Sequence, residues 1–321
     1  MGPSHVAADP ASSAPLLLVA NQTDRTLSVL DPAAGKELAA IPEGEVTGHE
    51  VTVSPDGRTA YVPIYGNSGV GRPGTDGSLM EAIDVASRKV TGRLDFGHGV
   101  RPHCPKINPK DGLLYVTTEL DQTVTVIDPK TLKIMGTVPT GAKESHMLAI
   151  TRDGRRGYTA NVGAGSVSVL DLVERKTVAV IPISGATQRI ALSTDDKVVF
   201  TADQTKPQLA VIDTASNTIQ QWVPLPAIGY GTAPTPDGRW LLVAMQPAKQ
   251  IAVVDLKLMK VARTIDVPAA PAEIVVRPDG KMAYASMPGG AGVAAIRLDD
   301  WSLANVIPAG KGADGLVWVG K

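Results

Sequence analysis

Three histidines at equivalent positions of a repeated sequence pattern are the residues best suited to chemistry. The pattern first occurs at Gly48-His49-Glu50-Val51 and recurs six more times along the 321-residue chain. Its first residues are, in chain order, His49, His103, His146, Gln188, Tyr230, Ala272 and Asp314. Three neutral imidazoles with an open coordination position suit a divalent transition metal, and zinc, copper and iron all accept such ligands. The spacing therefore predicts a metal site held by the three histidines and leaves the identity of the metal open.

Charged and aromatic residues stand at or beside the same repeat position. Glu50, Asp314 and Glu119 are candidates for a general base or for a group that orients an imidazole. Arg189 and Tyr230 are candidates for holding a substrate anion or donating a proton. Each is alternatively a solvated rim residue, and Arg189 could also point between repeats. Further candidates for the ligand set are Asp203, Glu273 and, as a soft ligand, Cys104.

The repeats consist of four short β-rich runs separated by turn residues such as Ser54-Pro55-Asp56-Gly57. The second run of each unit ends at Asp31, Asp84, Asp128, Asp171, Asp213, Asp255 and Arg297, with spacings of 53, 44, 43, 42, 42 and 42 residues. A period near 42 residues with four strands per unit is typical of propeller blades. The sequence predicts an all-β fold, a seven-bladed β-propeller of four-stranded blades.

The two ends of the chain are out of phase with the repeat. The chain begins with the second strand of a blade and ends with an unpaired first strand, residues 315–319. We therefore expect the C-terminal strand to complete the N-terminal blade and remove an open sheet edge. Because the first strand of each blade lines the central channel, the three histidines are expected to converge at a solvent-filled channel mouth.

The runs Tyr61-Val62-Pro63-Ile64, Tyr115-Val116-Thr117-Thr118 and Tyr158-Thr159-Ala160-Asn161, with the Pro-Asp-Gly turns, resemble the YVTN β-propeller repeat family. The resemblance covers about residues 16 to 320. It implies the propeller fold strongly and a function only weakly, because such propellers serve as surface proteins, lactonase-like enzymes and cofactor-binding scaffolds.

One unit departs from the others by about ten extra residues, within the Gly-rich segment 66–77. The segment lacks the Gly-Lys-Ser/Thr ending of a phosphate-binding loop, so a nucleotide site is not expected. It is either a tolerated surface insertion or a lid over the channel mouth.

Composition excludes several kinds of partner. The net charge is −1 without a basic patch, which argues against nucleic acid, and no apolar stretch is long enough to span a membrane. Residues 1–14 read as a disordered leader ahead of one domain, residues 15–321. A signal peptide removed before this leader would place the protein in the periplasm or outside the cell. The twelve aromatic residues show no stacking platform for sugars or bases.

These observations favour a metal-dependent enzyme of hydrolase or lyase type that acts on a small molecule, or an oxidoreductase if the metal is copper or iron. Two alternatives stay open. One is a non-catalytic secreted propeller that binds a ligand or a protein partner. The other is a metal-free lactonase-like enzyme.

Overall fold

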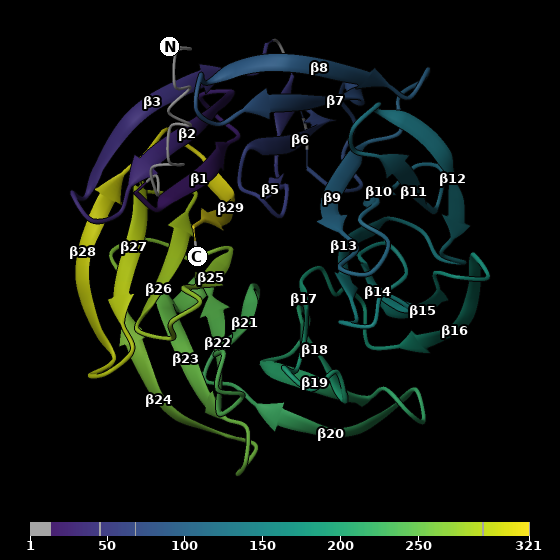
Figure 1. Ribbon diagram of the computed structural model, residues 1–321. Coiled ribbons are helices and arrows are strands. Elements are labelled where there is room, and N and C mark those ends of the chain that lie inside the picture. Colours follow the sequence, from purple (N-terminus) through teal and green to yellow (C-terminus); the bar gives the residue numbers. More distant parts are fainter. Residues whose placement is uncertain (1–13, 45, 68, 291, 321) are drawn as a thin grey trace, which may run out of the picture.

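The computed structural model describes residues 14–44, 46–67, 69–290 and 292–320. The leader expected at residues 1–14 lies outside these ranges except for its last residue. In the described residues, seven antiparallel sheets follow one another around a central axis (Figure 1). This arrangement confirms the predicted seven-bladed β-propeller.

The blades are numbered here in chain order, each from its innermost strand outward. Blade 1 contains β29 (Ala313–Val319), β1 (Leu16–Asn21), β2 (Thr26–Asp31) and β3 (Lys36–Pro42). Blade 2 contains β4 (Thr47–Gly48) and β5 (Thr52–Val53), then β6 (Thr59–Gly66), β7 (Asp76–Asp84) and β8 (Lys89–Asp95). Blade 3 contains β9 (Pro102–Ile107), β10 (Leu114–Thr118), β11 (Thr123–Asp128) and β12 (Lys133–Pro139).

The remaining blades repeat this order. Blade 4 contains β13 (Ser145–Ile150), β14 (Arg156–Asn161), β15 (Ser166–Asp171) and β16 (Lys176–Pro182), and blade 5 contains β17 (Ile190–Leu192), β18 (Val198–Asp203), β19 (Gln208–Asp213) and β20 (Thr218–Pro224). Blade 6 contains β21 (Thr232–Pro234), β22 (Trp240–Met245), the 3-10 turn η1 (Gln246–Ala248), β23 (Gln250–Asp255) and β24 (Lys260–Asp266). Blade 7 contains β25 (Ile274–Val276), β26 (Met282–Met287), β27 (Gly292–Arg297) and β28 (Ser302–Pro308).

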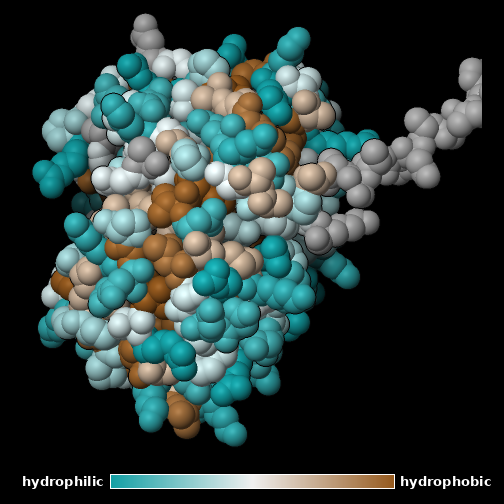
Figure 2. Space-filling view, turned by 90° about the vertical axis from the view of Figure 1, so that its left-hand side faces the viewer, coloured by the Kyte–Doolittle hydropathy of each residue, from teal (hydrophilic) through white to brown (hydrophobic). Residues whose placement is uncertain are grey.

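Burial within a blade follows its strand order. The second and third strands are covered by neighbouring blades on both faces, so their residues are almost all buried, as in β1 and β2. The outermost strands alternate between buried or half-buried and exposed residues, as β16 does. Seen from the rim, hydrophilic side chains cover most of the surface, and hydrophobic residues gather in bands between them (Figure 2).

The ring closes through the two ends of the chain, as the sequence predicts. Strand β29 pairs antiparallel with β1, and Leu17 lies opposite Trp318 in this register. The Tyr284 ring of blade 7 stacks on Trp318 of blade 1 with centroids 5.6 Å apart, so side-chain packing also joins these two blades. This closure gives β1 an inner partner strand, so both sides of β1 are paired.

Blade 2 is the irregular one. Its innermost strand is divided into β4 and β5, and His49 and Glu50 lie in the gap between them. The insertion joins β6 to β7, and the backbone passes so close at Gly77 that a Cβ atom there would lie 1.7 Å from the Ile64 carbonyl oxygen. The glycine is therefore required where the insertion returns to the blade at the start of β7. Among the described residues, no helix has the length and apolar character that a bilayer-spanning segment needs.

Candidate functional site at the channel mouth

The three histidines meet in one buried cluster. His103 and His146 begin the innermost strands of blades 3 and 4, and His49 interrupts that of blade 2. The rings of His103 and His146 are stacked with centroids 3.5 Å apart, and the His49 ring stands edge-on to His103 at 5.7 Å. Tyr65 completes the cluster, with its ring centroid 4.4 Å from that of His49.

This cluster lies deeper than the sequence suggests. The exposed fraction is 7% for His49 and 1% for both His103 and His146, so the imidazoles are not bathed by a solvent-filled mouth. Burial lowers the pKa of His49 to about 3 and that of His103 well below its usual value, and the positive potential of neighbouring groups adds to the effect. Both rings are therefore neutral at physiological pH, which is the form that binds metal ions.

His103 has no hydrogen-bond partner for either ring nitrogen within the described part of the chain. A buried polar group without a partner costs about 1–3 kcal/mol, so such groups are rare and need an explanation. His146 differs, because its Nδ1 faces Glu119 and its Nε2 lies 3.0 Å from the amide nitrogen of Gln188. The amide donates to Nε2, so the proton of this ring sits on Nδ1 and is donated to Glu119.

Glu119 holds two members of the cluster at once. Its Oε1 accepts the Nδ1 proton of His146, and its Oε2 accepts a 2.7 Å hydrogen bond from the Tyr65 hydroxyl. The Glu119 carboxylate is buried. Burial raises the pKa of the Tyr65 hydroxyl above its usual value and the nearby carboxylate adds to the rise, so the phenol stays protonated. Such a carboxylate–imidazole pair is the usual means of fixing the tautomer and orientation of a metal-binding histidine.

A second cluster, formed around Arg189, lies beside the first. Residues of this cluster directly follow His49, His146 and Gln188 in the sequence, and the Arg189 guanidinium contacts both Glu50 and Met147. The Arg189 guanidinium pairs with Glu50, with Glu273 at 2.6 Å and with Asp314 at 2.8 Å. Arg189 therefore points into the channel and not between blades.

The blade backbones approach closely at this cluster. The amide of Gly315 donates to the His49 carbonyl, and a Cβ atom at Gly315 would lie 2.4 Å from that oxygen. Only glycine fits between Asp314 and the chain at His49. Gln22 also reaches this point and donates to the Asp314 carboxylate.

Burial favours the protonated form of one carboxyl group in this cluster. Burial raises the pKa of Glu50 to about 8, against the opposing effect of Arg189, and the neighbouring Glu273 and Asp314 add to the rise. Burial disfavours the charged form of Arg189, but the same carboxylates outweigh it and raise its pKa well above the usual value. The Tyr230 ring lies 5.1 Å from the guanidinium, and burial raises the pKa of its hydroxyl to about 12.

The structure does not bring every candidate residue to the cluster. Asp203 accepts hydrogen bonds from Thr205 and Gln208 and caps its own turn. Cys104 is buried, its pKa is raised to about 11 by that burial, and its thiol points toward the Leu148 carbonyl. In the ranges that the structure describes, no group of three or more His, Cys, Asp or Glu side chains is arranged so that it could hold a metal ion.

A cavity of about 420 Å³ opens beside His49. Its described lining comes from blades 1 and 2 and from the insertion, and consists of Gln22, Thr23, Arg25, Val46, Thr47, His49, Asn67 and Gly69. Arg101 holds the insertion in place, because its guanidinium donates to Asp76 at 2.5 Å and to the Arg72 carbonyl at 2.6 Å. The insertion thus forms one wall of the cavity.

Sequence reasoning missed Tyr65, Gln22, Gln188 and Arg101. Gln188 stands at the repeat position of the histidines and could have been included on that ground. Tyr65 lies near the end of β6 and, counted from Tyr61 and Tyr115, stands at the repeat position of Glu119, so the repeat does give it an equivalent. Arg101 has a left-handed backbone conformation, φ 50°, which a sequence does not reveal.

Comparison with known proteins agrees with the class that the fold defines, a seven-bladed β-propeller. A family model described as the cytochrome D1 heme domain matches residues 107–232. The match includes Glu119, His146 and Arg189 but neither His49 nor His103. No curated protein matches the chain in sequence.

Three solved structures share the fold. Hydrazine synthase of Kuenenia stuttgartiensis is 18% identical with a TM-score of 0.71, and the alignment covers 85% of this chain and 95% of that one. The dihydro-heme d1 dehydrogenase NirN in complex with DHE is 15% identical with a TM-score of 0.70, over 99% of this chain and 77% of that one. A functionally unknown protein from Desulfotomaculum acetoxidans is 13% identical with a TM-score of 0.77, over 95% and 99%. Identities this low show a common fold alone.

Proposed function

We propose that the channel mouth binds one divalent transition metal ion through His49, His103 and His146 and uses it to act on a small molecule in the adjacent cavity. The observation that carries this proposal is the buried, neutral His103 ring, whose two nitrogens lack partners beside two further imidazoles. A ligand that fills this position would satisfy a group that is otherwise costly to bury. Binding requires the stacked rings of His103 and His146 to turn apart, because their present arrangement shares no coordination position, and it requires the Gln188 amide to leave the Nε2 of His146.

The remaining residues have distinct roles in this proposal. Glu119 orients His146, as its hydrogen bond to Nδ1 suggests. Glu50 and Asp314 are the candidate bases, and the ion would supply Lewis acidity at a reacting carbonyl or water. Arg189 is already paired with three carboxylates, so in this proposal it holds Glu50, Glu273 and Asp314 together and does not bind the substrate anion directly. Hydrolase or lyase chemistry fits zinc, and redox chemistry fits copper or iron.

The cavity beside His49 is the proposed substrate site. Its described lining is mostly polar, which favours a small hydrophilic molecule. The insertion would act as its lid, held by Arg101. A periplasmic or secreted location and membership of the YVTN repeat family are part of the same proposal, and a binding protein without catalysis is its alternative.

A haem group is the second candidate, because of the cytochrome D1 match and the NirN structure. The residues of this chain do not fit it. A porphyrin needs an open apolar slot on the face of its axial ligand, whereas His103 and His146 cover each other and are 1% exposed. The cavity at His49 has Val46 as the one aliphatic side chain in its described lining. We therefore derive no chemistry through haem.

The test is metal analysis of protein expressed without a polyhistidine tag. We expect near one equivalent of a transition metal by inductively coupled plasma mass spectrometry, and its return on titration with Zn²⁺, Cu²⁺ or Fe²⁺ after chelation. The His98→Ala variant is the matched control, since His98 is exposed, pairs with Asp121 and lies outside the cluster. No bound metal and no saturable titration would refute the metal site. A Soret band in the purified protein would favour haem instead.

A further inference from the structure

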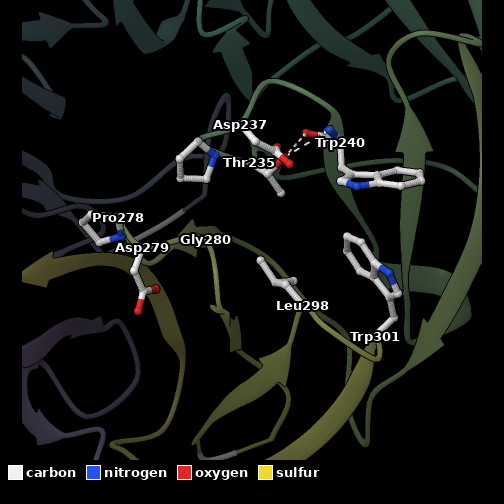
Figure 3. A pocket seen from close by; sticks show the side chains of 9 residues that line it. Thr235, Asp237, Trp240, Pro278, Asp279, Gly280, Leu298 and Trp301 are labelled. Atoms are coloured by element: carbon white, nitrogen blue, oxygen red, sulfur yellow. Dashed lines mark hydrogen bonds between the residues drawn. The ribbon is translucent and has the colours of Figure 1, made fainter.

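A second cavity lies on the face of the propeller opposite the channel mouth. It has a volume of about 210 Å³ and sits between blades 6 and 7. Its lining is Thr235, Pro236, Asp237, Trp240, Pro278, Asp279, Gly280, Leu298 and Trp301. Figure 3 shows the two indole rings on one side of the cavity and Pro278 and Asp279 on the other. No residue of this cavity belongs to the histidine or arginine clusters.

The two tryptophans form one aromatic corner from two blades. Trp240 begins β22 in blade 6, and Trp301 precedes β28 in blade 7. Their ring centroids are 5.4 Å apart with an interplanar angle of 70°, and both side chains are half-buried. An edge-to-face pair of this kind is rigid and offers a large flat apolar surface beside polar groups.

Both tryptophans are exceptions within the repeat. The carbonyl of Trp240 accepts the backbone hydrogen bond that closes the turn between the first two strands of blade 6. In five other blades the same hydrogen bond is accepted by Thr59, Leu113, Arg156, Val198 and Met282. The residue equivalent to Trp301, which precedes the outermost strand, is Gly35, Arg88, Leu132, Arg175, Asn217 and Met259. Among the described turns, only the neighbouring blades 6 and 7 place an aromatic residue at each of these two positions, Trp240 at the first and Trp301 at the second.

Trp301 also pays a conformational penalty for its place. Its φ of 61° lies in the left-handed region, which a bulky side chain rarely adopts. Every equivalent residue has a positive φ, so the turn imposes this geometry and glycine or asparagine would suit it better. Arg88, Leu132, Arg175 and Met259 meet the same demand in other blades, so the turn geometry is common to the repeat and the half-buried indole is what sets Trp301 apart.

Charge decides which ligand the corner suits. The guanidinium carbons of Arg239 and Arg263 lie 4.7 Å and 5.8 Å from the ring centroids of Trp240 and Trp301. Both oxygens of Asp279 are engaged by Arg277. A cationic ligand would meet indoles already in contact with cations, so it gains little. The ligand is better neutral, with an apolar face for the indoles and hydroxyl groups for the carboxylates.

We propose that this cavity binds a pyranose ring of a neutral saccharide. The C–H face of the sugar lies against the indole surface of Trp240 and Trp301, with Leu298 beneath it. Asp237 accepts hydrogen bonds from Thr235 and from the Arg239 amide through Oδ1, at 2.5 Å and 3.0 Å, which leaves Oδ2 for a sugar hydroxyl. Pockets with apolar walls and a few placed polar groups bind such ligands. The proposal is independent of the metal site.

The test is titration of the whole protein with the methyl glycosides of glucose, galactose, mannose and N-acetylglucosamine. Binding is followed by tryptophan fluorescence and by saturation-transfer NMR, with tetramethylammonium as the cationic probe. We expect saturable binding of at least one glycoside, and little of the ammonium ion. The Trp301→Asn variant, which copies Asn217 of blade 5, should weaken the affinity at least about tenfold without lowering the melting temperature.

Two variants separate binding from folding. Asp237→Asn keeps the Oδ1 acceptor of its turn and should weaken binding while the turn persists. Trp222→Leu, in β20 and outside the cavity, should leave the affinity unchanged. The proposal is overturned if no glycoside binds in the millimolar range, if Trp301→Asn binds as tightly as the native protein, or if the ammonium ion binds in place of the sugars.

Discussion

The imidazole rings of His103 and His146 are stacked, with centroids 3.5 Å apart and an interplanar angle of 30°. The pair joins blades 3 and 4 at the start of their innermost strands. His146 is anchored by Glu119 and Gln188, whereas His103 makes no hydrogen bond through its ring in the described part of the chain. Of the two rings, His103 is therefore the one that no hydrogen bond holds in its present orientation.

The first prediction concerns this ring. Replacement of His103 by Gln should abolish metal retention, because it leaves two imidazole ligands in place of three. The buried position would make His103→Ala a cavity variant, so glutamine is the better probe of ligation. Metal content and melting temperature are measured together. A His103→Gln protein that binds the metal with native affinity would contradict the three-histidine site.

The second prediction concerns Glu119, a positioning residue. Glu119→Gln keeps the size of the side chain but weakens its hold on the Nδ1 proton of His146. Loss of such a carboxylate partner typically lowers metal affinity about 10- to 100-fold. We expect that reduction by competitive chelator titration, with the fold intact by circular dichroism. Glu174→Gln, an exposed change on the rim, is the control. Equal affinities in the two variants would remove Glu119 from the site.

The fold could be read from the sequence in detail. The 42-residue period fixed the number of blades, because each turn signal recurs at the same phase, and β29 pairs with β1 as the two chain ends imply. The period holds because each blade packs only on its neighbours and faces the same geometric demand. What repeats along the chain is therefore predictable from the chain.

The site could be predicted only in part. The repeat position of His49, His103 and His146 indicates that they converge, and they do form one cluster. Their stacking and the depth of the cluster come from side-chain packing that the repeat position does not reveal, and the contact with Tyr65 adds a residue of blade 2, the blade that carries the insertion. The contact between Trp240 and Trp301 could not be predicted from the repeat either, because the two residues occupy different repeat positions in adjacent blades.

The third prediction is a pH dependence of stability. Burial raises the pKa of Glu50 from 4.5 to about 8 in the folded protein, so the folded state binds a proton more tightly than the unfolded chain. This contribution to stability is full below pH 4.5 and is lost as the pH rises through about 8. Glu50→Gln removes the titration and should lose less stability than the native protein between pH 6 and pH 9. Urea unfolding at both pH values measures the difference, with Glu174→Gln as the control. Parallel losses in the native and Glu50→Gln proteins would contradict the raised pKa.

The fourth prediction tests the closure of the ring. Deletion of residues 313–321 removes β29 and exposes the inner edge of β1, together with the core side chains Leu17 and Leu18. We expect a protein that unfolds or self-associates, measured by light scattering and thermal denaturation. A circular permutant opened in the turn between β15 and β16 keeps every strand and should remain monomeric. An unchanged melting temperature in the deletion variant would show that β29 does not close the ring.

The last prediction concerns Arg189, which joins four blades across the channel. Its guanidinium pairs with Glu50 of blade 2, Glu273 of blade 7 and Asp314 of blade 1, and its side chain is 1% exposed. Replacement by Met leaves these carboxylates crowded and unpaired, and removal of one partner from a buried ion pair typically costs about 3–5 kcal/mol. We expect a loss of that order in the free energy of unfolding at neutral pH.

The matched control is Arg152→Met, because Arg152 makes an exposed ion pair with Asp196 at 3.1 Å that should contribute at most about 1 kcal/mol. A second change distinguishes charge from packing. If the cost of Arg189→Met comes from uncompensated carboxylates, the added substitution Asp314→Asn should recover part of the lost stability, and lowering the pH toward 5 should do the same. A loss that neither the second substitution nor acid reduces would mean that Arg189 stabilises the channel through packing with Met147 and Tyr230 and not through its ion pairs.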